Sequence, residues 1–173
     1  TGLAVFKDDV LVGELNSIET LCFSIIKNNV DGFLISVPTP NKSNSYIDLH
    51  LTPLISPNVK VDILNGTPYI ELNCTFTGRI YSMEDDSDYL DSNILDQISN
   101  SCNSYLESIL SEYLYKTSKS LNSDINGFGK IERKNFLTLD EFYDYNWKEN
   151  YRHAFFNVTV DSSIRSSSLL TES

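Results

Sequence analysis

Few residues of this chain could carry out chemistry, and their spacing matches no catalytic motif. His50 and His153 are the two histidines, the side chains used most often as acids, bases or metal ligands near neutral pH. The sequence shows a partner for neither of them. It contains no GxSxG, GxGxxG, GxxxxGK[ST] or HExxH motif. We therefore predict no catalytic residue, no cofactor and no enzymatic activity.

The three cysteines, Cys22, Cys74 and Cys102, are too few and too widely spaced for a disulfide scaffold or a zinc site. Each falls at an apolar position of the surrounding hydrophobic pattern. We predict that all three are small core residues whose thiols react slowly in the native protein.

Carboxylates are concentrated in residues 84–91, EDDSDYLD, and such groups supply the oxygen ligands that calcium prefers. The spacing fails for an EF-hand, because Asp91 stands at the sixth loop position from Asp86, where glycine is required. We interpret the run as solvated residues before a long helix, where negative charge favours the helix dipole. The sequence thus predicts no metal site.

The segment SDINGFG follows the longest helical pattern, and neither helical nor strand periodicity explains its residues. Gly127 and Gly129 permit left-handed dihedral angles or close backbone approach, and Asp124 can cap neighbouring amides. Phe128 between the glycines is either a plug into the core or a contact for a partner. The candidate residues for a structural turn or a partner contact are Asp124, Gly127, Phe128 and Gly129.

Hydrophobic periodicity predicts an α+β fold, an antiparallel β-sheet packed by one long amphipathic helix and shorter helices. Alternating apolar residues predict strands joined by short turns such as Asn65-Gly66. Apolar residues at helical spacing from Ile94 to Leu121 predict the long helix. The strands lie near residues 46–52, 57–64, 68–80 and 154–162, and the helix lies near 91–121. We expect Leu72, Cys74, Phe76, Leu106, Ile109 and Leu110 to be buried between them.

The remaining segments predict smaller elements. Residues 3–15 form a hairpin around Lys7-Asp8-Asp9, and Asn16 or Ser17 caps a short helix. The segment FLISV forms another strand, and a shorter helical region runs from Ile131 to Trp147. The serine-rich tail has little to bury and is expected to fray.

Length and charge restrict the class of protein. A chain of 173 residues is one domain's worth. Its 24 acidic and 13 basic residues give a net charge of −11, which repels nucleic acids and anionic membranes. No apolar run approaches the roughly 18 residues that a transmembrane helix needs. The chain opens at Thr1 without a signal region, so we expect a fragment or a processed product.

Several segments, in this order, resemble the C-terminal domain of the Ger(x)C (GerAC-type) spore germination lipoproteins. They are GLAVFKDDVLVGELN, the DINGFG turn after a long helix, IERKNF, Asn146-Trp147, and a closing V-x-V with Ile164-Arg165. The resemblance spans essentially all 173 residues. The family pattern has a glycine after the Ile-Arg pair, where this chain has serines, and that departure concerns the conformation of the tail.

The resemblance implies a non-enzymatic lipoprotein subunit of a germinant receptor in an endospore-forming bacterium. Such a subunit lies at the outer face of the spore inner membrane, lipid-anchored, beside membrane-embedded A- and B-type subunits. Residues 1–173 would then be a single C-terminal domain, soluble as a fragment, with the N-terminal domains and the lipid anchor missing. The family has no known catalytic residue or cofactor.

Two functional hypotheses stay open from the sequence. The first is an interaction or signal-relay module in spore germination. The alternative is a domain that binds a small-molecule germinant or a cation directly. A binding pocket needs polar groups that converge in an apolar cleft, and convergence is a property of the folded chain.

Overall fold

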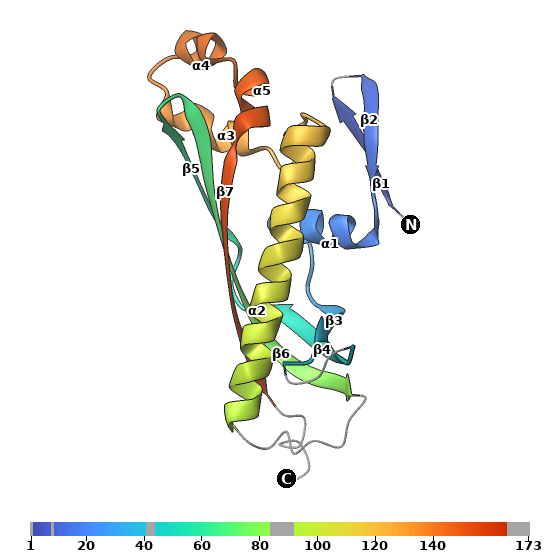
Figure 1. Cartoon of the computed structure of the whole chain (residues 1–173). Helices are drawn as coiled ribbons and strands as arrows, with labels where there is room; N and C mark the ends of the chain where they lie inside the picture. Colours follow the sequence, from blue (N-terminus) through green and yellow to red (C-terminus); the bar gives the residue numbers. More distant parts are fainter. Residues whose placement is uncertain (1, 8, 41–43, 84–91, 166–173) are drawn as a thin grey trace. The chain divides into compact units, whose positions relative to one another are not determined.

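The computed structural model describes residues 2–7, 9–40, 44–83 and 92–165. It confirms the α+β fold with antiparallel strands (Figure 1). The chain divides into two compact units. Unit 1 comprises Thr1–Asn29, Pro57–Leu72 and Ile109–Val158, and unit 2 comprises Val30–Ser56, Asn73–Ser108 and Thr159–Ser173. The predictions for the acidic run at 84–91 and for the serine-rich tail from residue 166 fall outside the described residues.

The predicted N-terminal hairpin and helix are both present in unit 1. Strand β1 (Leu3–Lys7) pairs antiparallel with β2 (Val10–Leu15), and a bulge lies between Val5 and Phe6. Helix α1 (Ser17–Ile26) is capped by Asn16, whose Oδ1 accepts a hydrogen bond from Glu19 N at 2.9 Å. Glu19 Oε2 accepts from Asn16 N at 2.8 Å in return. This capping box sets the start of the helix.

A five-stranded sheet contains the predicted strands, with small changes in their bounds. Its strands are β3 (Phe33–Pro38), β4 (Tyr46–Pro53), β5 (Asn58–Leu64), β6 (Thr67–Met83) and β7 (Phe155–Arg165). The order is β3-β4-β6-β5, and β7 also pairs with β6. Asn65 and Gly66 have φ values of 51° and 80°, the left-handed pair that a two-residue hairpin turn requires. They join β5 directly to β6.

The core of unit 2 follows the alternation of β4. Ile47, Leu49 and Leu51 on one face are fully buried, because each second residue of a strand points to the same side. Helix α2 (Ser92–Tyr115) adds further buried residues to this unit. They are Ile98, Cys102 and Leu106.

The part of β7 in unit 2 is covered along its backbone by polar side chains of α2. Glu107 Oε1 accepts a hydrogen bond from Val160 N at 2.9 Å, and Ser99 Oγ accepts one from Ile164 N at 3.3 Å. These side chains accept from amides of β7, which pairs with β6 alone among the strands of the described residues. The helix therefore protects a sheet edge that would otherwise be open to another chain.

The cysteines are core residues, as predicted. Cys22, Cys74 and Cys102 are buried, and none forms a disulfide. Burial raises the pKa of Cys74 to about 12 and that of Cys102 to about 11. The nucleophilic thiolate is therefore scarce at both positions near neutral pH.

The long helix ends earlier than predicted. The α-helical hydrogen bonding stops at Tyr115, and a π-helical turn, η1 (Lys116–Ser120), replaces the expected α-helix up to residue 121. The reason is tertiary, because Thr117 is buried and its Oγ1 lies 2.9 Å from Tyr151 Oη. Lys116 Nζ donates to both carboxylate oxygens of Glu19 at 2.8 Å. The wider turn carries both contacts.

Two other expectations are corrected. Ile109 is only half-buried, whereas Leu106 and Leu110 on the same helix are fully buried. The region from Ile131 to Trp147 is broken into short elements because Thr138 starts a new helix with a capping box and Asn146, at φ 52°, ends it. These elements are α3 (Phe128–Glu132), η2 (Arg133–Asn135), α4 (Leu139–Tyr145), α5 (Trp147–Asn150) and η3 (Tyr151–His153).

Candidate functional site

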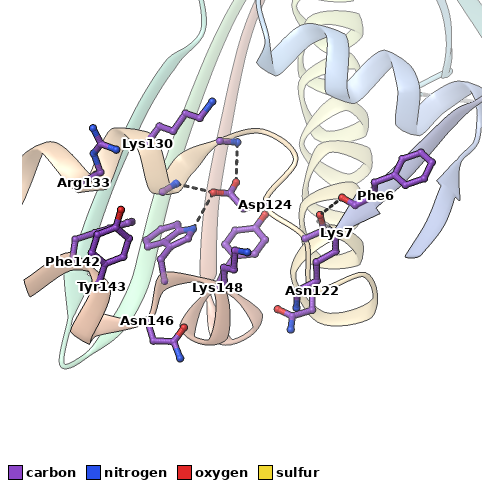
Figure 2. Close-up of a pocket in the computed structure, with 15 residues that line it drawn as sticks. Phe6, Lys7, Asn122, Asp124, Lys130, Arg133, Phe142, Tyr143, Asn146 and Lys148 are labelled. Carbon is purple, nitrogen blue, oxygen red and sulfur yellow. Dashed lines mark hydrogen bonds between the residues drawn. The ribbon is translucent and has the colours of Figure 1, made fainter. Parts of the chain in front are cut away.

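The candidate site is an open pocket of about 420 Å³ that lies within unit 1 (Figure 2). Its walls come from the β1 end of the hairpin, the loop after η1, and the short helices α3, η2, α4, α5 and η3. We call it the Asp124 pocket after the carboxylate at its centre. Its lining residues are Phe6, Lys7, Asn122, Ser123, Asp124, Gly127, Gly129, Lys130, Arg133, Phe142, Tyr143, Asn146, Trp147, Lys148 and Tyr151.

Asp124 organises this pocket through four hydrogen bonds. Its Oδ1 accepts from the backbone N–H groups of Gly127 and Phe128, both at 2.9 Å. Its Oδ2 accepts from Gly129 N at 2.7 Å and from Trp147 Nε1 at 2.9 Å. Hydrogen bonds to an ionised carboxylate are stronger than neutral ones. One side chain thus holds both the start of α3 and the indole of α5.

Glycine is needed at positions 127 and 129 for two different structural reasons. Gly127 has φ +80°, a conformation in which a side chain is strained. Gly129 lies against the indole, since a Cβ there would stand 2.6 Å from Trp147 Cδ1 and Nε1. The first glycine shapes the turn, and the second lets Trp147 reach Asp124.

Aromatic rings form the floor of the pocket and the core behind it. Trp147 and Tyr151 are stacked at 6.0 Å between ring centroids, and Phe128 packs on Tyr151 at 6.3 Å. Phe128 is 1% exposed and Trp147 is 6% exposed. Burial raises the pKa of Tyr151, so its hydroxyl stays protonated and shares the hydrogen bond with Thr117. The floor is thereby fixed in position.

The hairpin is tied to the other wall of the pocket through the loop after η1. Ser123 Oγ donates to Phe6 O at 3.2 Å. With its amide oxygen turned toward the hairpin, Asn122 accepts from Lys7 Nζ at 2.9 Å and donates to Lys148 O at 3.1 Å. Asn122 also has a positive φ of 44°. This asparagine therefore connects β1 to α5 from a sparsely populated backbone conformation.

The net charge of the lining residues is positive, whereas the net charge of the whole chain is negative. Lys7, Lys130, Arg133 and Lys148 line the pocket, and Asp124 is the sole acidic residue among the described residues that line it. The chain carries a net charge of −11. The Asp124 pocket is thus a local concentration of positive charge on an acidic protein.

All four residues singled out in the sequence belong to this region, but not in the same way. Asp124, Gly127 and Gly129 line the pocket, whereas Phe128 points into the core behind it. A partner contact at this turn stays a prediction, and it would use the pocket side of the turn. The cationic residues, and Asn122, were not predicted as site residues, because lysine, arginine and asparagine at these positions show no special spacing.

The structure offers no metal centre in its described part. No group of three His, Cys, Asp or Glu side chains comes together there, and both Asp124 oxygens already accept hydrogen bonds. His153 is exposed and His50 is half-buried. Among the helices of the described residues, none combines the length and the apolarity that crossing a membrane requires.

Comparison with known proteins gives one family and one fold match. The fold matches the crystal structure of the GerBC protein with a TM-score of 0.72 and 16% sequence identity, over 94% of this chain and 50% of the GerBC chain. No curated protein matches the sequence. The family model described as "Spore germination B3/GerAC like, C-terminal" matches residues 1–168. The chain therefore belongs to this family of spore germination proteins.

Proposed function

We propose that this chain is a non-enzymatic subunit of a spore germinant receptor and acts as an interaction or signal-relay module. The observation that carries the proposal is the family match over residues 1–168. The Asp124 pocket supports it, because interfaces concentrate their binding energy on rigid aromatic groups near a polar rim. The pocket floor has this character, because Asp124 holds the Trp147 indole and Thr117 bonds the Tyr151 hydroxyl. Exposed cationic side chains lie beside it.

The partners in this proposal are the membrane-embedded A- and B-type subunits of the receptor. The full-length protein would be held by a lipid anchor at the outer face of the spore inner membrane. Residues 1–173 would be its single C-terminal domain, preceded by the domains that carry the anchor. This chain spans about half of the GerBC chain, which supports a longer natural protein.

A pull-down from detergent-solubilised spore membranes tests the proposal. The bait is the tagged full-length protein, produced at its natural level, and the readout is mass spectrometry of the captured proteins. We expect membrane-embedded receptor subunits to be captured with it. Their absence under conditions where the bait is intact and located in the spore membrane would refute the interaction function.

The alternative is direct binding of a small-molecule germinant or a cation, and the size of the Asp124 pocket favours a small molecule. Small-ligand sites commonly enclose about 300 to 1,000 Å³, and this pocket of about 420 Å³ falls in that range. Isothermal titration against amino acids, sugars and calcium separates the two functions. Saturable heat with one of these compounds would support the alternative, and none is expected from an interaction module.

A further inference from the structure

We propose that the Asp124 pocket receives an acidic segment of a partner protein, in which carboxylates flank an apolar side chain. This inference rests on the proposed interaction function and names the chemistry of the partner. It is carried by three observations on the pocket: the absence of ion pairs at Lys130 and Arg133 within the described residues, the spread of the cations around the pocket, and the aromatic carbon exposed beside them.

Two cations of the pocket, Lys130 and Arg133, differ from three other cations of unit 1 that are paired with carboxylates. Lys60, Lys116 and Arg152 form ion pairs with carboxylates at 2.9, 2.8 and 3.1 Å. Within the residues that the structure describes, Lys130 and Arg133 form no ion pair. In a chain with 24 acidic residues against 13 basic ones, internal partners are abundant. We infer that the complementary charge comes from another molecule.

Lys7 has a neutral partner, an amide, in place of a carboxylate. Its Nζ donates to the Asn122 amide oxygen, which fixes the position of the ammonium group without neutralising it. Asp124 forms no ion pair with Lys7 in the described residues, and its oxygens accept instead from three backbone amides and the indole. Four cationic side chains against one carboxylate leave the lining with a net positive charge, which attracts an anion.

The arrangement of the cations favours an extended segment over a small anion. Figure 2 shows Lys130 and Arg133 on one side of Asp124, and Lys7 and Asn122 on the other. A single small carboxylate is held by donors that converge on one point. Cations on opposite sides suit several carboxylates spaced along a peptide, each meeting one positive side chain.

The exposed aromatic rings of the pocket account for the apolar part of the ligand. Phe6 is 55% exposed and Tyr143 is 68% exposed, and both line the pocket. On the hairpin, Val10 and Leu11 are exposed as well. Burying such surface against an apolar side chain gives the association its hydrophobic term.

Trp147 is the sole tryptophan of the chain and lines the pocket, so its fluorescence reports occupancy. The probe is a synthetic peptide in which glutamates flank one leucine, and the matched control has lysine in place of each glutamate. We expect a saturable change in Trp147 emission with the acidic peptide alone, and an affinity that weakens as salt is raised. Calorimetry of the same titration provides a second readout.

Variants at the rim test whether the cations are the cause. Arg133→Gln and Lys7→Gln should each weaken binding of the acidic peptide by about 2- to 5-fold, the range for exposed charge pairs. Lys134→Gln is the matched control, because Lys134 is exposed beside Arg133 but does not line the pocket. Equal affinities for the Arg133 and Lys134 variants would overturn the proposal.

Three other results would also overturn it. The first is the lack of a saturable response to the acidic peptide up to its solubility limit. The second is saturation by free glutamate in place of the peptide, and the third is a response to vesicles of anionic phospholipid. The proposed function is tested separately by adding Arg133→Glu and Lys134→Glu to the spore-membrane pull-down. If both variants capture receptor subunits equally, the pocket assignment fails and the interaction function stands. If the wild type captures none, the proposed function itself fails.

Discussion

Replacing Asp124 with asparagine should destabilise unit 1, although the two side chains have nearly the same shape. The carboxylate accepts two hydrogen bonds at each oxygen, from Gly127 and Phe128 at Oδ1 and from Gly129 and Trp147 at Oδ2. An asparagine has one accepting oxygen and one NH₂ group. Either orientation of the amide therefore places its NH₂ group against two other donors.

The expected loss follows from those two unsatisfied donors. An orphaned buried donor costs about 1 to 3 kcal/mol, so the substitution should cost about 2 to 6 kcal/mol. Asp124 is only half-buried, so water can reach part of the site and the lower half of that range is expected. With a urea m-value of about 2 kcal/mol per molar, the unfolding midpoint falls by about 1 M or more.

Urea unfolding followed by Trp147 fluorescence measures this loss in the unit where the change is made. Asp144→Asn is the control, because it removes the same charge from an exposed position on α4 and should alter stability by less than about 0.5 kcal/mol. If Asp124→Asn matches this control, the four hydrogen bonds do not hold the turn, and Asp124 does not organise the pocket.

Three further outcomes are expected. Phe128→Ala should cost about 3 to 5 kcal/mol, because the ring is 1% exposed, and should lower the melting temperature by about 6 to 20 °C; a fall of under about 2 °C would contradict its place in the core. Leu110→Ala should cost about 2 to 5 kcal/mol by urea unfolding, and a loss below about 1 kcal/mol would show that this face of α2 is not core. The thiols should react slowly in the native state and completely in denaturant. Burial raises the pKa of Cys74 from 9.0 to about 12 and that of Cys102 from 9.0 to about 11. The contribution of these buried, protonated thiols to the free energy of unfolding should therefore be fully present below about pH 9 and be lost as the pH rises through the raised values. Urea midpoints that stay constant up to pH 12 would refute this.

Local patterns were sufficient for most of the secondary structure. Alternation of Ile47, Leu49 and Leu51 predicts β4, and burial of all three follows from the geometry of a strand with one covered face. Asn65-Gly66 predicts a tight hairpin because both residues tolerate positive φ. In each case the decisive interactions join residues close together in the sequence.

The end of the long helix was decided by contacts that no local pattern contains. Apolar spacing up to Leu121 favours a continuous α-helix. The folded chain instead forms a π-helical turn, which accompanies the Thr117–Tyr151 and Lys116–Glu19 contacts. These partners are 34 and 97 residues away along the chain. Hydrophobic periodicity carries no information about pairs so far apart in the sequence.

The sequence alone indicated that Asp124 can bind nearby amides and that its glycines suit a turn, and it left a partner contact at the same residues open. Three of its four hydrogen bonds are of that local kind. The fourth, from Trp147, joins a residue 23 positions away, and Lys7 reaches Asn122 from the opposite end of the chain. A pocket is the space between segments, so its position, depth and charge existed only once tertiary packing had brought β1, α3 and α5 together.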